Sequence, residues 1–184
     1  MSQHYIEIKE EPDPSSYFYF TPAIVKSTFQ ITWDDNETLD DFFCIEEGDI
    51  DCFLAYFLFK YFDENLIYNK ERFDGVYIEG FAWWIDENFF TYDQIENMCQ
   101  EIEECAKLLA VDYENELLDG VKERFSIFYM CDQDENDYKN RDSSDEAMKR
   151  HVDVVIDFYN RFVTRIRKMM KDTPETNLIL ITGP

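Results

Sequence analysis

The chain has 184 residues, of which 41 are Asp or Glu and 17 are Lys or Arg, and its formal net charge at pH 7 is -24. Because 45% of the residues are hydrophobic and 17% are aromatic, the chain is not one of the acidic sequences that stay disordered for lack of apolar residues. So large a negative charge argues against direct binding to nucleic acid or to an anionic membrane, since both require a cationic surface.

The chain is expected to fold as one domain, over residues 1–184, in the cytoplasm. Its length is that of a single domain, and no Gly/Ser-rich or Pro-rich linker divides it. The first residues lack the regions of a signal peptide, and the longest apolar stretch, around residues 53–62, is too short to cross a bilayer. The cysteines form no CxxC pair, and we interpret them as free thiols in a reducing compartment: Cys44, Cys52, Cys99, Cys105 and Cys131.

Three short strands are predicted in the first third of the chain, near residues 4–9, 17–20 and 28–33. Apolar and polar residues alternate in them, which is the period of a half-buried strand. In the third segment Phe29 and Trp33 share a face, and a turn-forming Asp-Asp-Asn sequence follows. The first third is therefore expected to form a small meander.

The middle of the chain is predicted to contain a helix near residues 50–62 and a strand near residues 76–85. In the first segment apolar residues recur at steps of three and four behind an acidic first turn. The second segment is apolar on both faces, which is typical of a central strand. Within it Glu79 would need a basic partner, and the consecutive Trp83 and Trp84 would point to opposite faces.

The clearest helix start in the sequence is Thr91. With Gln94 three residues later it matches a capping box, in which the two side chains satisfy backbone N–H groups at the start of a helix. An apolar stripe with an acidic opposite face follows. We therefore predict an amphipathic helix near residues 91–110.

Residues 112–130 leave two interpretations open. The spacing of apolar residues that starts at Leu117 fits a helix. Asp119 and Gly120 could end such a helix, however, and residues 124–130 could instead form a strand.

The last part of the chain is predicted to contain an exposed acidic loop near residues 132–146, a long amphipathic helix near residues 144–171 and a short strand near residues 178–181. From Lys149 to Lys171 the helix holds seven basic residues against two acidic ones. We expect these cations to form a solvated face or a clamp onto the acidic body of the same chain. The order of elements indicates an α+β fold with a mostly antiparallel sheet covered by helices.

No catalytic, metal-binding or cofactor-binding residues are assigned. The chain lacks GxGxxG, Walker A, GxSxG and HExxH motifs, and its two histidines, His4 and His151, lack the spacing of common metal sites. The acidic loop has oxygen-bearing residues at alternating positions, as a calcium-binding loop does. It departs from that pattern at Asp137, where the loop needs Gly, and at Ser143, where it needs Glu.

The acidic residues are expected to share one face that binds a basic protein, with an indole as its aromatic anchor. In general character, although by no motif, such a chain resembles the immunity proteins that inhibit nuclease toxins. We therefore predict a non-enzymatic intracellular inhibitor of this type. The residues assigned to partner binding are Asp34, Asp35, Glu37, Asp40, Asp41, Glu46, Glu47, Trp83, Asp132 and Asp134.

Three alternatives stay open on the sequence alone. A nucleic-acid mimic would carry its acids in two regular rows and occupy the groove of a DNA-binding enzyme. A carboxylate- or metal-dependent enzyme would need several acids to converge in a pocket. A regulatory component would bind through exposed apolar residues of the long last helix. The positions of the acids on the folded surface distinguish between these functions.

Overall fold

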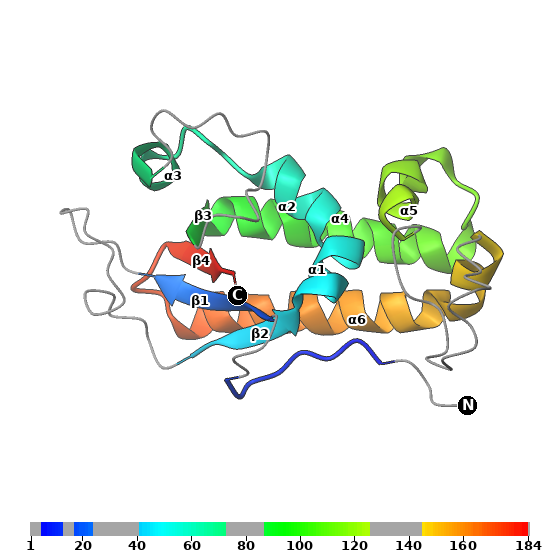
Figure 1. The fold of residues 1–184 in the computed structure, drawn as a ribbon, viewed down its shortest axis with the longest axis horizontal. Coiled ribbons are helices and arrows are strands. Elements are labelled where there is room, and N and C mark those ends of the chain that lie inside the picture. Colours follow the sequence, from blue (N-terminus) through cyan, green and yellow to red (C-terminus); the bar gives the residue numbers. More distant parts are fainter. Residues whose placement is uncertain (1–4, 13–16, 24–40, 73–86, 126–144, 184) are drawn as a thin grey trace.

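The computed structural model describes residues 5–12, 17–23, 41–72, 87–125 and 145–183. Within them the chain forms an α+β fold with a four-stranded antiparallel sheet in the order β2-β1-β4-β3, as expected (Figure 1). The strands are β1 (Tyr17–Ala23), β2 (Phe43–Glu46), β3 (Glu87–Thr91) and β4 (Leu178–Thr182).

The last strand, β4, lies inside the sheet between β1 and β3. Thr182 pairs with Tyr19 on one side and with Glu87 on the other. All residues of β4 are buried, as its continuous apolar sequence predicts for a strand with both faces covered. The short strand predicted near residues 178–181 is therefore confirmed, and it occupies a central position.

Two long helices, α4 (Tyr92–Val111) and α6 (Asp145–Asp172), pack against each other along the long axis of the molecule (Figure 1). The predicted capping box starts α4: Thr91 Oγ1 accepts from the Gln94 N–H at 3.2 Å, and Gln94 Oε1 accepts from the Thr91 N–H at 2.7 Å. The other described helical elements are α1 (Glu47–Phe53), α2 (Ala55–Tyr61), α3 (Ile67–Arg72), the 3-10 turn η1 (Glu116–Leu118) and α5 (Asp119–Phe125).

Aromatic side chains from the sheet and the helices fill the core. Phe20 and Phe43, on neighbouring strands, stack with ring centroids 4.8 Å apart, and Phe162 of α6 packs edge-on against both. Tyr159, also in α6, is fully buried and donates a hydrogen bond of 2.9 Å to the carbonyl of Phe53. This bond satisfies a polar atom that burial would otherwise leave without a partner, and it joins α6 to α1.

The segment predicted as a helix near residues 50–62 is helical, but a break at Leu54 divides it into α1 and α2. The Leu54 N–H still bonds to the Ile50 carbonyl at 2.9 Å, and the Leu58 N–H bonds to the Leu54 carbonyl at 3.0 Å. The backbone bonds thus keep the helical spacing across the break. For this reason the apolar pattern gives no sign of it.

The region around residues 112–130 is helical as far as Phe125. Asp119 begins α5 and does not end a helix, so the strand considered for residues 124–130 is wrong at its start. Residues 126–130 lie outside the described residues. Leu118 is the leucine that fills the core, whereas Leu117, which the helical spacing had placed on the apolar face, is exposed.

The first predicted strand, near residues 4–9, does not form a strand in its described part, which joins β2 only by one isolated bridge, where Lys9 and Cys44 exchange backbone hydrogen bonds of 2.9 and 2.8 Å. The strand near residues 17–20 is confirmed and extends to Ala23. Several predictions fall outside the described residues: the strands near 28–33 and 76–85, and the acidic loop near 132–146, apart from its last two residues, which begin α6.

Candidate functional site

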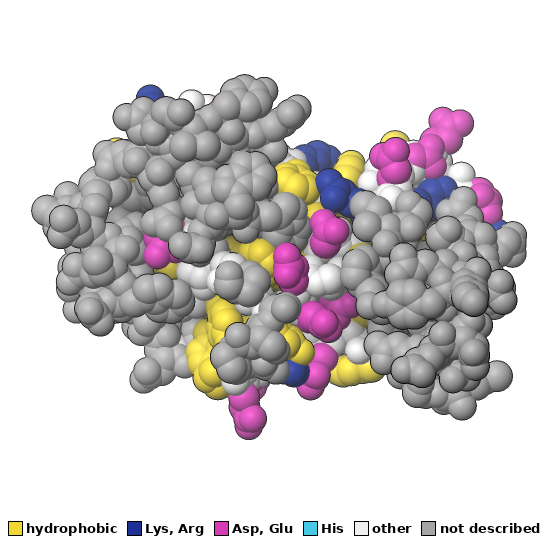
Figure 2. Space-filling model, in the orientation of Figure 1, with side chains coloured by type: hydrophobic (Ala, Val, Ile, Leu, Met, Phe, Trp, Pro, Cys, Tyr) yellow, Lys and Arg dark blue, Asp and Glu magenta, His cyan; other side chains and the backbone are white. Residues whose placement is uncertain are grey.

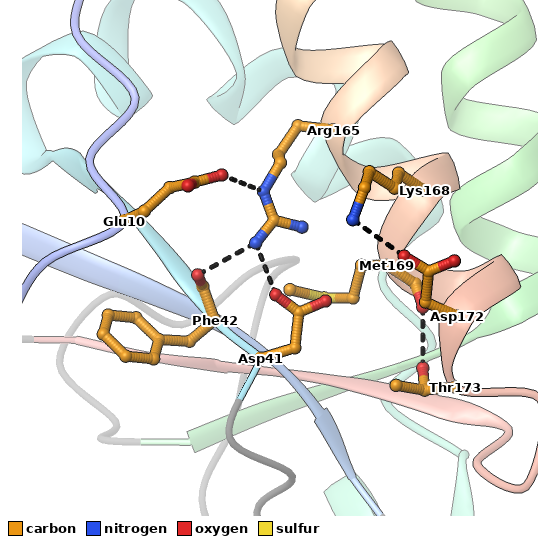
Figure 3. Close-up of polar contacts among 8 residues, drawn as sticks. All are labelled: Glu10, Asp41, Phe42, Arg165, Lys168, Met169, Asp172 and Thr173. Carbon is orange, nitrogen blue, oxygen red and sulfur yellow. Dashed lines mark hydrogen bonds and ion pairs between the residues drawn. The ribbon is translucent and has the colours of Figure 1, made fainter.

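The basic end of α6 is bound to acidic groups of the same chain. Arg165 donates through Nε to the Glu10 carboxylate at 2.9 Å, and through Nη2 to the Asp41 carboxylate and to the Phe42 carbonyl (Figure 3). Its side chain is only 13% exposed. Arg165 therefore holds two acidic segments, which are far apart from it in sequence, against the helix.

Arg167 bridges two carboxylates of α4. It donates to Glu96 at 2.8 and 3.0 Å and to Glu103 at 2.7 and 3.1 Å, so each carboxylate receives two hydrogen bonds. The hydrogen bonds that Arg167 donates to Glu96 lower the pKa of Glu96, and the bonds that it donates to Glu96 and Glu103 raise its own pKa. This paired geometry fixes the register between the two long helices.

Arg161 binds the amino-terminal segment. It donates to Asp157 on its own helix at 2.7 Å and to the Ile6 carbonyl at 2.9 Å, and its guanidinium lies 4.3 Å from the ring centroid of Tyr5. The expected clamp onto the acidic body is confirmed for Arg165 and Arg167, whereas Arg161 binds an acid of its own helix and a backbone carbonyl. Their guanidinium groups are held by the chain itself.

A first group of surface acids lies where β2 runs into α1. It consists of Glu46, Glu47, Asp49 and Asp51, and we call it the α1 acidic surface. Figure 2 shows acidic side chains gathered over the middle of this face, where α1 lies in Figure 1. Burial, with a smaller contribution from the charge of Glu46, raises the pKa of Asp49 to about 7. Arg124 approaches Asp51 at 3.4 Å.

The structure places three of the residues assigned to partner binding. Glu46 and Glu47 are exposed and lie together in the α1 acidic surface. Asp41 is held by Arg165 and belongs to the clamp. The other assigned residues lie outside the described residues: Asp34, Asp35, Glu37, Asp40, Trp83, Asp132 and Asp134.

A second acidic surface, which the sequence did not single out, lies between α4 and α5. We call residues Val111–Asp119 the α4–α5 connection. It exposes four acids together with Val111 (80% exposed) and Leu117 (76% exposed). The sequence contained one indication of this surface. Leu117 and Leu118 are consecutive, so both cannot face the core from the same helix, and one of them had to be exposed among the acids. The four exposed acids are Asp112, Glu114, Glu116 and Asp119.

The described thiols and His151 offer no assembled reaction centre. The four described cysteines are buried, and burial raises the pKa of Cys99 to about 12 and that of Cys105 to about 11, so these two thiols stay protonated at neutral pH. His151 is half-buried on α6. In the part of the chain that the structure describes, no group of three or more His, Cys, Asp or Glu residues is arranged to hold a metal ion. Cys131 and Glu79 lie outside that part.

None of the described helices is both long enough and apolar enough to cross a membrane. Comparisons with protein-family models, with curated proteins and with solved structures find no match to this chain.

Proposed function

We propose that the chain is a non-enzymatic binding protein that docks an acidic surface on a basic protein and inhibits it, as immunity proteins do with nuclease toxins. The observation that carries the proposal is the internal clamp. Arg161, Arg165 and Arg167 of α6 are engaged within the chain, while Glu46 and Glu47 and the acids of the α4–α5 connection remain exposed.

The physical consequence is a surface that attracts cations. With a net charge of -24, exposed carboxylates produce a negative field that raises the association rate of a basic partner and repels phosphate groups. The clamp adds to this effect because a guanidinium that already has partners within the chain is poorly placed to bind a phosphate. A basic protein is therefore the partner class that fits, and neither nucleic acid nor a membrane surface is proposed.

The proposal is tested by affinity capture. The immobilised chain is exposed to a lysate of its own organism at low ionic strength, bound proteins are eluted with a salt gradient, and each is identified and purified. We expect a basic protein whose dissociation constant rises steeply with salt, since ions screen the attraction. Retention of no basic protein at low ionic strength would overturn the proposal.

A matched pair of variants shows whether the charges act locally. E46Q/E47Q removes two exposed carboxylates of the α1 acidic surface, and D153N/E175Q removes two exposed carboxylates elsewhere. Both variants have the same net charge, so a larger loss of affinity in the first would locate binding at that surface. The inhibitor claim is tested separately, by the activity of the purified partner with and without the chain, and an unaffected activity would contradict it.

A further inference from the structure

The α4–α5 connection combines exposure of large apolar side chains with a strongly acidic surround. Among the described residues, four large hydrophobic side chains are highly exposed: Tyr5, Ile67, Val111 and Leu117. The ring of Tyr5 lies 4.3 Å from the guanidinium of Arg161, and Ile67 is the first residue of α3. Val111 and Leu117 fall in the same short connection. Neither side chain is buried in the core, and the occurrence of two of them in one short connection makes it a candidate contact surface.

The connection is held rigidly in place. The Asp112 N–H bonds to the Leu108 carbonyl at 2.7 Å, and the Asn115 N–H bonds to the Asp112 carbonyl at 3.1 Å. The Asn115 side chain accepts from the Leu117 N–H at 3.0 Å and donates to the Asp112 carboxylate at 3.0 Å. Every turn of the connection is thus fixed by a hydrogen bond. Leu117 is therefore presented to solvent by a preorganised backbone, which lowers the entropy lost on binding.

The inner side of the connection is packed into the protein. Tyr113 is 8% exposed and Leu118 is fully buried. The ammonium groups of Lys122 and Lys149 lie 5.4 and 5.6 Å from the centroid of the Tyr113 ring. The buried side chains of Tyr113 and Leu118 thus hold the connection against the protein, and they leave Leu117 exposed to solvent.

The charge around Leu117 selects the partner. Besides the four exposed acids of the connection, Glu123 of α5 is also exposed. Two lysines approach them: Lys149 pairs with Glu114 at 2.6 Å, and Lys122 with Asp119 at 3.1 Å. Figure 2 shows acidic side chains gathered at the end of the molecule where α5 lies. Two apolar side chains set in such a surround are complementary to a cationic segment that carries apolar residues.

We propose that the α4–α5 connection is the docking surface for the partner, and that its occupant is a basic segment with an apolar side chain that covers Leu117 and Val111. This inference rests on the proposed function and specifies where the basic protein binds. The carboxylates attract and orient the segment, and burial of Leu117 contributes affinity that does not depend on salt.

The probes are two short amidated peptides. One contains lysine and leucine at helical spacing, and in the other every leucine is replaced by serine, so that the charge is unchanged. Each is titrated into the isotope-labelled full chain at low ionic strength while backbone amide chemical shifts are followed. We expect the lysine–leucine peptide to shift amides of Val111–Asp119 and to bind about tenfold more tightly than the lysine–serine peptide.

Three substitutions locate the contact, and each leaves the charge unchanged. Leu117→Gln and Val111→Gln should each weaken binding of the lysine–leucine peptide, Leu117→Gln by about tenfold, whereas Ile67→Gln, at an exposed position outside the connection, should have no effect. Because all three side chains are exposed, the thermal midpoints should stay close to that of the unmodified chain.

The outcomes separate this inference from the function on which it rests. If the lysine–leucine peptide binds but shifts the α1 acidic surface, or binds L117Q as tightly as the unmodified chain, the docking surface is wrong and the proposed function stands. If neither peptide binds at low ionic strength, the docking surface is also wrong, and the proposed function is decided by the affinity capture of a basic protein.

Discussion

The side chain of Asn69 pairs with the backbone of Phe89 as a neighbouring strand would. Its Oδ1 accepts from the Phe89 N–H at 3.0 Å, and its Nδ2 donates to the Phe89 carbonyl at 3.0 Å and to the Asp63 carbonyl at 2.8 Å. Phe89 lies in β3, an edge strand of the described sheet, and Asn69 is fully buried. The amide therefore occupies backbone groups that an edge strand would otherwise offer to another chain.

Asn69→Ala is expected to lower the free energy of unfolding by about 2–3 kcal/mol, because it removes three hydrogen bonds of a buried amide to the backbone of Phe89 and Asp63. Urea denaturation followed by circular dichroism measures the change. Asn65→Ala is the matched control, since Asn65 is exposed four residues earlier, and it should change stability by no more than about 0.5 kcal/mol. Equal stabilities of the two variants would show that the pairing with Phe89 contributes nothing.

Replacing Arg167 tests the clamp between the two long helices. Arg167→Met should lower the free energy of unfolding by about 1 kcal/mol, a modest amount because the side chain is 33% exposed. Arg167→Lys should recover less than half of this loss, since an ammonium group cannot make paired hydrogen bonds to two carboxylates. Lys171→Met, at an exposed position of the same helix, is the control.

Salt identifies the origin of the Arg167 effect. In about 1 M salt the difference between the unmodified chain and R167M should shrink, because ion pairs at the surface are screened. A difference that is the same at low and high salt would assign the loss to packing of the apolar part of the side chain and not to its charge.

Asp49 is expected to make stability depend on pH. In the folded protein its pKa is raised from 3.8 to about 7, mainly by burial. Between these values the unfolded chain has released the proton and the folded protein still holds it, so the free energy of unfolding falls as pH rises from about 4 to about 7. Asp49→Asn removes this contribution. It should match the unmodified chain near pH 4 and be more stable by about 1–3 kcal/mol near pH 8.

The control for Asp49→Asn is Glu47→Gln, which removes the same charge from an exposed position in the same turn of α1. Any stabilisation that comes only from the lower net charge should appear in both variants. Urea denaturation at several pH values measures the difference. If D49N and E47Q show the same dependence on pH, the folded-state titration of Asp49 is not the cause.

Predictions from sequence succeeded where the determining contacts are local. The start of α4 follows from Thr91 and Gln94, which bond to each other within one turn. The strand β3 was not predicted, because its first residues, Glu87 and Asn88, are polar and are nevertheless buried by the fold. The four residues of β2 are too few for a period-2 pattern to be distinguished from the start of a helix.

The same distinction applies to the candidate site. The abundance of carboxylates at Glu46 and Glu47 is visible in the sequence, and so is the basic character of α6. Arg165 binds Glu10 and Asp41, which are each more than one hundred residues away from it in the sequence. The periodicity of apolar residues predicts local structure and cannot predict such contacts. Either Leu117 or Leu118 could have faced the core. In the 3-10 turn η1 it is Leu118 that is buried, so Leu117 is exposed.

The last prediction concerns the contact between Gly120 of α5 and Tyr56 of α2. A Cβ atom at Gly120 would lie 2.7 Å from Cε2 of the Tyr56 ring, so Gly120→Ala should force the ring aside and lower the free energy of unfolding by about 1 kcal/mol. With Tyr56→Ala already present the ring is gone, and the same Gly120→Ala change should stabilise by up to about 1 kcal/mol, since alanine is the better helix former. A double-mutant cycle in urea measures this reversal of sign. Stabilisation by Gly120→Ala in the unmodified chain would show that the ring yields freely, and the conclusion that this contact requires glycine would then be wrong.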